Sequence, residues 1–147
     1  MEAIKLYRIA NKLYKHKIPV LPKIFYRMIY LINNCHIHYT TKIGKGTKLG
    51  YGGISVVIHK DAEIGDNCMI GSCVTIGGRS GIKKLPVIGN NVYIGTGAKI
   101  LGDLKIGDNS VIGANAVVIT DFPANSIIAG VPAKLLKNNN LMGDIDK

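Results

Sequence analysis

Histidine is the side chain whose charge changes near neutral pH, and this chain has four histidines. A neutral imidazole beside a hydroxyl group can take its proton and act as a general base. All four precede residue 60, at His16, His36, His38 and His59. His59 directly follows the apolar run Val56–Ile58, where an internal repeat slips out of phase. These residues predict acid–base chemistry near the start of the repeat, with a structural role in a turn as the alternative for His59.

The number and spacing of the cysteines do not favour a metal site. Cys35, Cys68 and Cys73 are odd in number and lack the spacing of metal ligands. Cys68 falls on a repeat position that elsewhere holds a small residue. We therefore expect a buried free thiol at this position, a reducing cytosolic environment and no bound metal.

A six-residue repeat must position these side chains. Between residues 88 and 118, an aliphatic residue opens each repeat, glycine usually follows it, and a small or β-branched residue stands four places after it. The openers are Ile88, Ile94, Ile100, Ile106, Ile112 and Val118. A period of six fits short strands joined by sharp turns, and neither a helix nor a long alternating strand. Stacked coils would bury the openers as one continuous column.

The repeat is interrupted twice. Earlier openers run in phase through Ile37, Ile43 and Leu49, and then resume at Ile58, so three residues are inserted within GYGGISVV at residues 50–57. The second interruption is GGRSGIKKLPV at residues 77–87, which we interpret as a loop projecting from the coils. Insertions in a repeat array tend to cluster on its functional face.

Residues 1–35 lie outside the repeat and predict two helices, Glu2–Lys15 and Lys23–Asn33, separated by Pro19 and Pro22. The first helix carries a cationic stripe of Lys5, Arg8, Lys12 and Lys15. We expect a helical cap over the first coil. The alternative, which is compatible with a cap, is a basic amphipathic segment lying on an anionic membrane.

Composition limits the remaining classes. A chain of 147 residues with 47% hydrophobic residues has the size and the core-forming capacity of one folded domain. The net charge of +10 implies acidic partners, but aromatic residues are too few to favour nucleic acid. The apolar run Ile24–Ile32 is short and broken by Arg27, and no signal peptide is evident. We expect a cytoplasmic protein, with peripheral contact at the inner membrane face as the variant.

The phrases IGTGAKILGDLKIGDNSVIGANAVV and SIIAGVPAKLL resemble the hexapeptide-repeat acyltransferases. That resemblance implies an all-β fold, a left-handed parallel β-helix, over residues 36–137. It also implies a homotrimer and acetyl-CoA as co-substrate. The remaining parts are then the N-terminal helical segment 1–35 and a polar tail at 138–147.

Residues 37–78 resemble the serine acetyltransferase branch more narrowly, and within it the short members that O-acetylate sugars of capsule, O-antigen or colanic acid. A sugar or polysaccharide precursor is therefore the expected acceptor. By this resemblance, the branch's catalytic histidine falls near Tyr51 or Gly52 in this chain, the aspartate that supports it on His36, and the aspartate beside it on Gly50. A second active-site histidine and the arginine before it fall on Leu85 and Lys84, so the groups that read serine are mostly missing. Serine O-acetylation for cysteine synthesis is the alternative acceptor chemistry. A non-catalytic scaffold and a zinc-dependent carbonic anhydrase are the other classes on this fold.

The resemblance also suggests roles for individual residues. We predict His59 as the general base, with His36 as the second candidate, and Tyr51 as a residue that orients the acceptor. Arg79 and Lys84 would reach a phosphate or an acidic sugar, unless they are merely solvated loop charges. The coenzyme candidates are the small residues that would lie along the pantetheine arm and one lysine for the phosphates: Gly97, Ala98, Ala114, Ala133 and Lys134.

Overall fold

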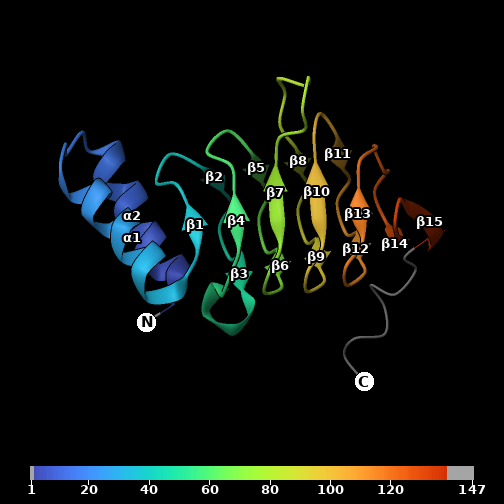
Figure 1. Cartoon of the computed structure of the whole chain (residues 1–147), viewed down its shortest axis with the longest axis horizontal. Helices are drawn as coiled ribbons and strands as arrows, with labels where there is room; N and C mark the ends of the chain where they lie inside the picture. Colours follow the sequence, from blue (N-terminus) through green and yellow to red (C-terminus); the bar gives the residue numbers. More distant parts are fainter. Residues whose placement is uncertain (1, 139–147) are drawn as a thin grey trace.

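The chain winds into a left-handed β-helix with two helices over its N-terminal end, as a computed structural model that describes residues 2–138 shows (Figure 1). Helices α1 (Ala3–Lys15) and α2 (Leu21–Asn33) pack on each other and on the first coil. The predicted fold class is therefore confirmed. The second helix begins at Leu21, and not at Lys23, because proline is accepted in the first turn of a helix, where Pro22 lies.

Successive coils contribute short strands to three sheets, named A, B and C here, in which all neighbours pair in parallel except β14 and β15. Sheet A contains β1 (His36–Ile37), β4 (Val57–Ile58), β7 (Thr75–Gly77), β10 (Lys99–Leu101) and β13 (Val117–Val118). Sheet B contains β2 (Lys42–Ile43), β5 (Glu63–Ile64), β8 (Val87–Ile88) and β11 (Lys105–Ile106). Sheet C contains β3 (Lys48–Leu49), β6 (Met69–Ile70), β9 (Tyr93–Ile94), β12 (Val111–Ile112), β14 (Ser126–Gly130) and β15 (Ala133–Asn138).

The repeat openers form the core, as the period predicted. Parallel pairing joins equivalent openers of successive coils, for example Ile58 with Ile76 and Ile76 with Ile100. Their side chains are buried and belong to a single hydrophobic cluster. Cys68 is buried on its small-residue position, in agreement with the prediction for this thiol.

Some glycines of the repeat are required by close approach between coils. A Cβ atom added at Gly65 would stand 2.5 Å from the carbonyl oxygen of Gly89 and 2.5 Å from Oδ1 of Asn90. Both atoms belong to the next coil, so this spacing leaves no room for a side chain. Gly77, by contrast, has no atom within 4 Å of the position that a Cβ would take.

Buried polar contacts fix α1 to the first coil. Tyr7 donates its hydroxyl hydrogen to the carbonyl oxygen of Thr41 at 2.5 Å, and Asn11 donates to the carbonyl of Tyr39 at 2.7 Å. The Arg8 guanidinium donates to the carbonyl of Ile43 at 2.6 Å and also to that of Gly44. Arg8 therefore helps to fix the helical cap to the first coil. Of the cationic stripe expected on α1, only the lysines do not take part in these contacts. Neither described helix is long and apolar enough to cross a membrane.

Both interruptions of the repeat bulge from sheet A, but at opposite edges (Figure 1). The first forms the short helix η1 (Gly50–Gly53) just before the chain enters β4. The second leaves β7 and projects as a loop before β8, as expected for residues 77–87. We call the turns from sheet C to sheet A the CA edge, and the turns from sheet A to sheet B the AB edge.

The C-terminal stretch ends in a hairpin that the repeat did not predict. Strand β14 continues sheet C in parallel with β12, and β15 then returns antiparallel to β14. The turn between them contains Val131–Pro132. Of the polar tail predicted for residues 138–147, all but Asn138 lies outside the described residues.

Gly65→Ala should lower the free energy of unfolding by about 1–3 kcal/mol, because the new methyl group meets the backbone of the neighbouring coil. Gly77→Ala is the matched control and should change it by no more than about 0.5 kcal/mol. Urea titration followed by circular dichroism measures both values. Equal stabilities of the two variants would contradict the close approach described here.

Candidate functional site

The predicted site residues separate onto the two edges of sheet A. Residues that precede a strand of this sheet lie at the CA edge, and residues that follow one lie at the AB edge (Figure 1). Tyr51, Gly97, Ala98 and Ala114 lie in turns of the CA edge, and His36 begins β1 on the same side of sheet A. Ala133 and Lys134 lie in β15 at the end of sheet C, whereas His59, Arg79 and Lys84 belong to the AB edge. The structure thus brings together two subsets of the prediction, and not the whole set.

The coenzyme candidates on the CA edge form a continuous row across successive coils. A Cβ at Gly95 would stand 2.6 Å from the backbone nitrogen of Ala114, and one at Gly113 would stand 3.0 Å from Cβ of Ala129. Ala129 in turn pairs with Lys134 across the terminal hairpin. Gly97, Ala114 and Lys134 therefore lie on neighbouring turns of one edge.

This row has the length of an extended ligand. Tyr51 follows β3, and Lys134 lies beside β14, four strands further along sheet C. With a spacing of about 4.8 Å between strands, the two positions are roughly 19 Å apart along the helix axis. A cation at one end and an aromatic hydroxyl at the other suit a long molecule that has phosphates at one end.

One coenzyme candidate is corrected by the structure. Ala98 has 0% of its surface exposed and belongs to the hydrophobic cluster. It fills the inner corner of its coil and has no surface with which to contact a ligand. Ala133 is also nearly buried, at 9% exposure, so Gly97, Ala114 and Lys134 offer the accessible surface of this row.

His36 lies at the start of the CA edge, where α2 contacts the first coil. Its Nε2 is 2.5 Å from the hydroxyl oxygen of Tyr26, which comes from α2. Desolvation by burial raises the pKa of Tyr26, so this phenol stays protonated near neutral pH. The two residues line a largely apolar pocket of about 360 Å³ with Arg27, Tyr30 and Leu31. If the Nε2–H donates to the phenol oxygen, Nδ1 is left with a free lone pair.

Tyr51 is strongly solvent-accessible, at 81% exposure. It adopts φ of +50°, a conformation uncommon for a tyrosine, and it is followed by Gly52 and Gly53, which also have positive φ. Asn33 at the end of α2 donates to the carbonyl of Gly52 at 3.1 Å and so holds this turn. An open pocket of about 560 Å³ lies in front of Tyr51, lined also by Lys5 of α1.

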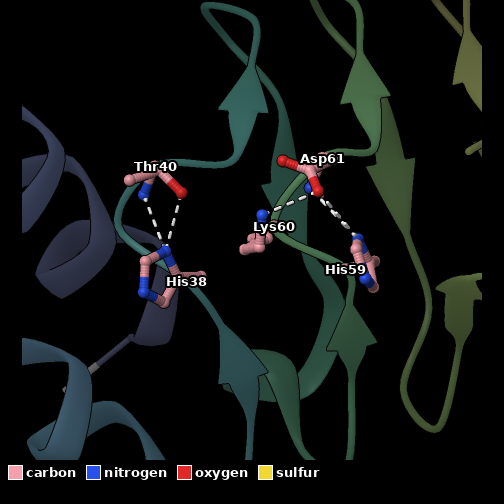
Figure 2. A network of polar contacts seen from close by, with 5 residues as sticks. All are labelled: His38, Thr40, His59, Lys60 and Asp61. Carbon is pink, nitrogen blue, oxygen red and sulfur yellow. Dashed lines mark hydrogen bonds and ion pairs between the residues drawn. The ribbon is translucent and has the colours of Figure 1, made fainter.

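His59 and His38 occupy equivalent turns of the AB edge and make the same local contact (Figure 2). Nδ1 of His59 accepts a hydrogen bond from the backbone N–H of Asp61 at 3.2 Å, and Nδ1 of His38 accepts one from that of Thr40 at 3.3 Å. The Asp61 carboxylate lies 3.8 Å from Nδ1 of His59 and accepts a hydrogen bond from Lys60 Nζ at 2.8 Å. That hydrogen bond from Lys60 lowers the pKa of Asp61, so its carboxyl is ionised.

These contacts decide which nitrogen of His59 carries a proton. Accepting the Asp61 N–H requires a lone pair on Nδ1, which leaves the proton of the neutral ring on Nε2. A general base that acts through Nε2 needs the opposite tautomer, with Nδ1–H directed at the Asp61 carboxylate. The backbone N–H of Asp61 therefore disfavours the tautomer in which Nε2 can act as a base, whereas the Asp61 carboxylate favours it. The shared contact at His38 strengthens the structural alternative for His59.

The loop residues lie above the next coil of the same edge. The Lys84 ammonium is 3.7 Å from the Asp103 carboxylate, which follows β10. Arg79 forms a backbone bridge with Ile82 inside the loop, and its side chain packs near Gly102. Lys84 thus has an acidic partner within the chain, which lowers its availability for a phosphate.

The residues that the structure describes contain no group of three or more histidine, cysteine, aspartate or glutamate side chains placed to hold a metal ion. His36, His38 and His59, which a carbonic anhydrase would need on one metal, instead contact Tyr26, Thr40 and Asp61 respectively.

Sequence reasoning missed two features of this region. Tyr26 was counted only as part of a helix, although its hydroxyl reaches His36. The ordered turn held by Asn33 was also missed. A weak signal for both exists in the sequence, since the end of α2 lies only a few residues before β1 and must pack beside it.

Residues 86–120 match a family model described as bacterial transferase hexapeptide (six repeats). Among curated relatives, the chain is 36% identical over 146 residues to a serine acetyltransferase of Synechococcus elongatus, covering 97% of this chain and 59% of the relative. It is 38% identical over 138 residues to a serine acetyltransferase of Helicobacter pylori strain J99, covering 92% of this chain and 80% of the relative. The chain thus spans about three-fifths of the first relative's length.

Solved structures give the same result. Serine acetyltransferase from Brucella abortus strain S19 in complex with coenzyme A superposes with a TM-score of 0.85 at 33% identity, covering 92% of this chain and 55% of that one. The Neisseria gonorrhoeae serine acetyltransferase in complex with serine has a TM-score of 0.82 at 36% identity, covering 90% and 54%.

His38 gives a testable pH dependence. Desolvation, followed by the charges of His36 and Lys60, lowers its pKa below the ordinary value of 6.5. Below about pH 6.5 the unfolded chain therefore binds a proton that the folded chain resists, so stability is lost as the pH falls through this window. His38→Gln should lose less stability than the wild type between about pH 7.5 and pH 5.5. Urea midpoints at both pH values measure this, with His16→Gln on the exposed helical turn as the control. An unchanged pH dependence in His38→Gln would contradict it.

Proposed function

Because this chain belongs to the hexapeptide-repeat transferases, we propose that it is an O-acetyltransferase that uses acetyl-CoA. The observation that carries the proposal is the row of accessible small residues that runs along the CA edge to Lys134. The likeness to a solved serine acetyltransferase with bound coenzyme A supports it.

In this proposal, the coenzyme lies along the CA edge. Gly97 and Ala114 offer surface without large side chains, so a thin pantetheine arm can approach the backbone. Lys134 supplies the positive charge for the phosphates at the far end. The thioester then points toward the first coil, where His36 and Tyr51 are found.

The comparisons support serine as the acceptor better than the sugar hydroxyl that the sequence put first, because the relatives reported above are serine acetyltransferases. A specific observation nevertheless favours a second candidate. Tyr51 occupies the turn where the resemblance to serine acetyltransferases leads us to expect a histidine, and the pocket beside His36 is walled by Tyr26 and Tyr30. Aromatic walls of this kind suit the face of a sugar ring.

The reaction needs a base, an attacking oxygen and a leaving thiolate. The base takes the acceptor's hydroxyl proton, the oxygen bonds to the thioester carbonyl carbon, and the C–S bond breaks. The thiolate then takes the proton back from the base. Within one subunit, the geometry supports His36 as this base, because it shares the CA edge with the coenzyme candidates.

The role of His59 as general base remains a prediction, and it requires a second subunit. We propose a homotrimer, as the resemblance implied, in which the AB edge of one subunit faces the CA edge of its neighbour. His59, Arg79 and Lys84 would then join the coenzyme row across the interface. A cytoplasmic setting is the matching proposal, because the cysteines are free thiols, two of them buried.

The purified protein should release coenzyme A thiol from acetyl-CoA when an acceptor hydroxyl is present. Serine is the acceptor that we expect to stimulate release, with nucleotide sugars and oligosaccharides as the second panel. If only the sugars stimulate thiol release, the acceptor is a sugar hydroxyl and not serine. No acetyl-CoA binding and no thiol release with any acceptor would favour a non-catalytic scaffold.

His36→Asn should lower kcat by about 10²- to 10⁴-fold while thermal stability and acetyl-CoA affinity are largely kept, because a base acts only in the transition state. His59→Asn and Asp61→Asn are run in parallel with thermal melts. The opposite result, with kcat lost in His59→Asn and kept in His36→Asn, would show that the base is His59 and that the two edges meet between subunits.

Lys134→Ala should raise KM for acetyl-CoA with little change in kcat, because a remote phosphate contact is made equally in the ground state and the transition state. Lys137→Ala on the same strand is the matched control and should leave KM unchanged. Steady-state kinetics at saturating acceptor measure both, and an unchanged KM in Lys134→Ala would refute the phosphate role.

A further inference from the structure

The outward side of α2 is apolar although nothing within the described chain covers it. Leu21, Ile24 and Leu31 are spaced by three and seven residues, so they lie on one side of the helix, and Ile32 adjoins them. We call these four residues the outer face of α2. All four are exposed, with Leu31 at 79%. Pro22 and Ile29 are the buried residues of this helix, Phe25 and Met28 pack partly buried against the core, and Tyr26 contacts His36 of the first coil.

The same region carries most of the chain's excess charge. Residues 2–35 contain seven basic side chains and one acidic one, a formal charge of +6 out of +10 for the whole chain. Lys23 and Arg27 are exposed on α2, one helical turn apart beside the outer face. Of the basic residues of α1, Arg8 is used in contacts with the coil, but Lys12 and Lys15 are exposed.

The apolar side chains and the surrounding positive charge together indicate what binds to the outer face of α2. Two copies of a surface with this charge repel each other, which disfavours pairing of the helices in solution. An anionic lipid surface offers both an apolar phase for the leucine and isoleucine side chains and negative headgroups for the lysines. We propose that the outer face of α2 docks this protein on an anionic phospholipid membrane.

The position of the helices suits a flat surface. They cover one end of the β-helix, at the end remote from the terminal hairpin (Figure 1). In a trimer whose threefold axis runs along the coils, all three helical ends point the same way. Three weak contacts then act together and raise the affinity without any new contact. Only this gain rests on the proposed trimer, since the single face is present in each chain.

Co-sedimentation with lipid vesicles tests the proposal. The full chain should sediment with vesicles of phosphatidylcholine mixed with phosphatidylglycerol, and not with phosphatidylcholine alone, and added salt should weaken the binding. Leu21→Ser/Ile24→Ser should lower the partition coefficient by at least about tenfold. Lys23→Glu should lower it by about fivefold or more, whereas Lys105→Glu on the coils should bind like the wild type.

Three results would overturn the proposal: no binding to anionic vesicles, equal binding to neutral ones, or variants that bind like the wild type. A fourth would be a larger assembly of the wild type in sedimentation velocity that Leu21→Ser/Ile24→Ser reduces, since a second copy would then cover the face. Lys23→Glu keeps the test valid if the apolar variant does not fold. Acetyl transfer measured without vesicles should be unchanged in Lys23→Glu, so failure of the proposed activity and failure of membrane docking remain distinguishable.

Discussion

The spacing between coils is the constraint on which the molecule depends. Parallel strands hold successive coils at about 4.8 Å, and at this distance the turns touch each other's backbone. Where a Cβ at Gly95 would stand 2.6 Å from the nitrogen of Ala114, only glycine is tolerated. The aliphatic openers can then stack as one column, and the outward residues of each turn are aligned with those of the next. Every functional arrangement described above is a row of such aligned positions.

The two interruptions of the repeat are departures from this regularity, and each modifies a different edge. The insertion at η1 exposes Tyr51 in a left-handed conformation that the regular turns do not impose on an aromatic residue. The loop after β7 carries cationic residues away from the coils and ties Lys84 to Asp103. A single chain therefore carries two separate groups of candidate residues, one a row of small residues and the other built of charged and imidazole groups. In the proposed trimer, a neighbouring subunit would bring the two groups together.

Most of the fold could be predicted from the sequence because the repeat is a local pattern that directly determines burial. The openers, the insertion near residue 50 and the projecting loop all followed from counting in sixes. The site was harder to predict. His59 drew attention because it follows the phase slip, but its tautomer depends on the Asp61 backbone, which the spacing of residues does not reveal. The contact of Tyr26 with His36 depends on how a helix docks against a coil, and this is set by packing between distant residues. Ala98 was misjudged for a simpler reason: a small residue in a repeat fits both an inner corner and a ligand surface.

A solenoid has no intrinsic length, because the last coil presents the same unpaired strands that the preceding coils used for pairing. The terminal hairpin supplies an end. Strand β15 runs opposite to its neighbour β14, and the pairing shifts in register between Ile127 and Ile128. A coil of another molecule cannot continue the parallel pattern on such a strand. With α1 beside β3 and β15 beside β14, sheet C of the described residues is interrupted at both ends by an element that breaks the parallel pattern, which disfavours end-to-end stacking of coils.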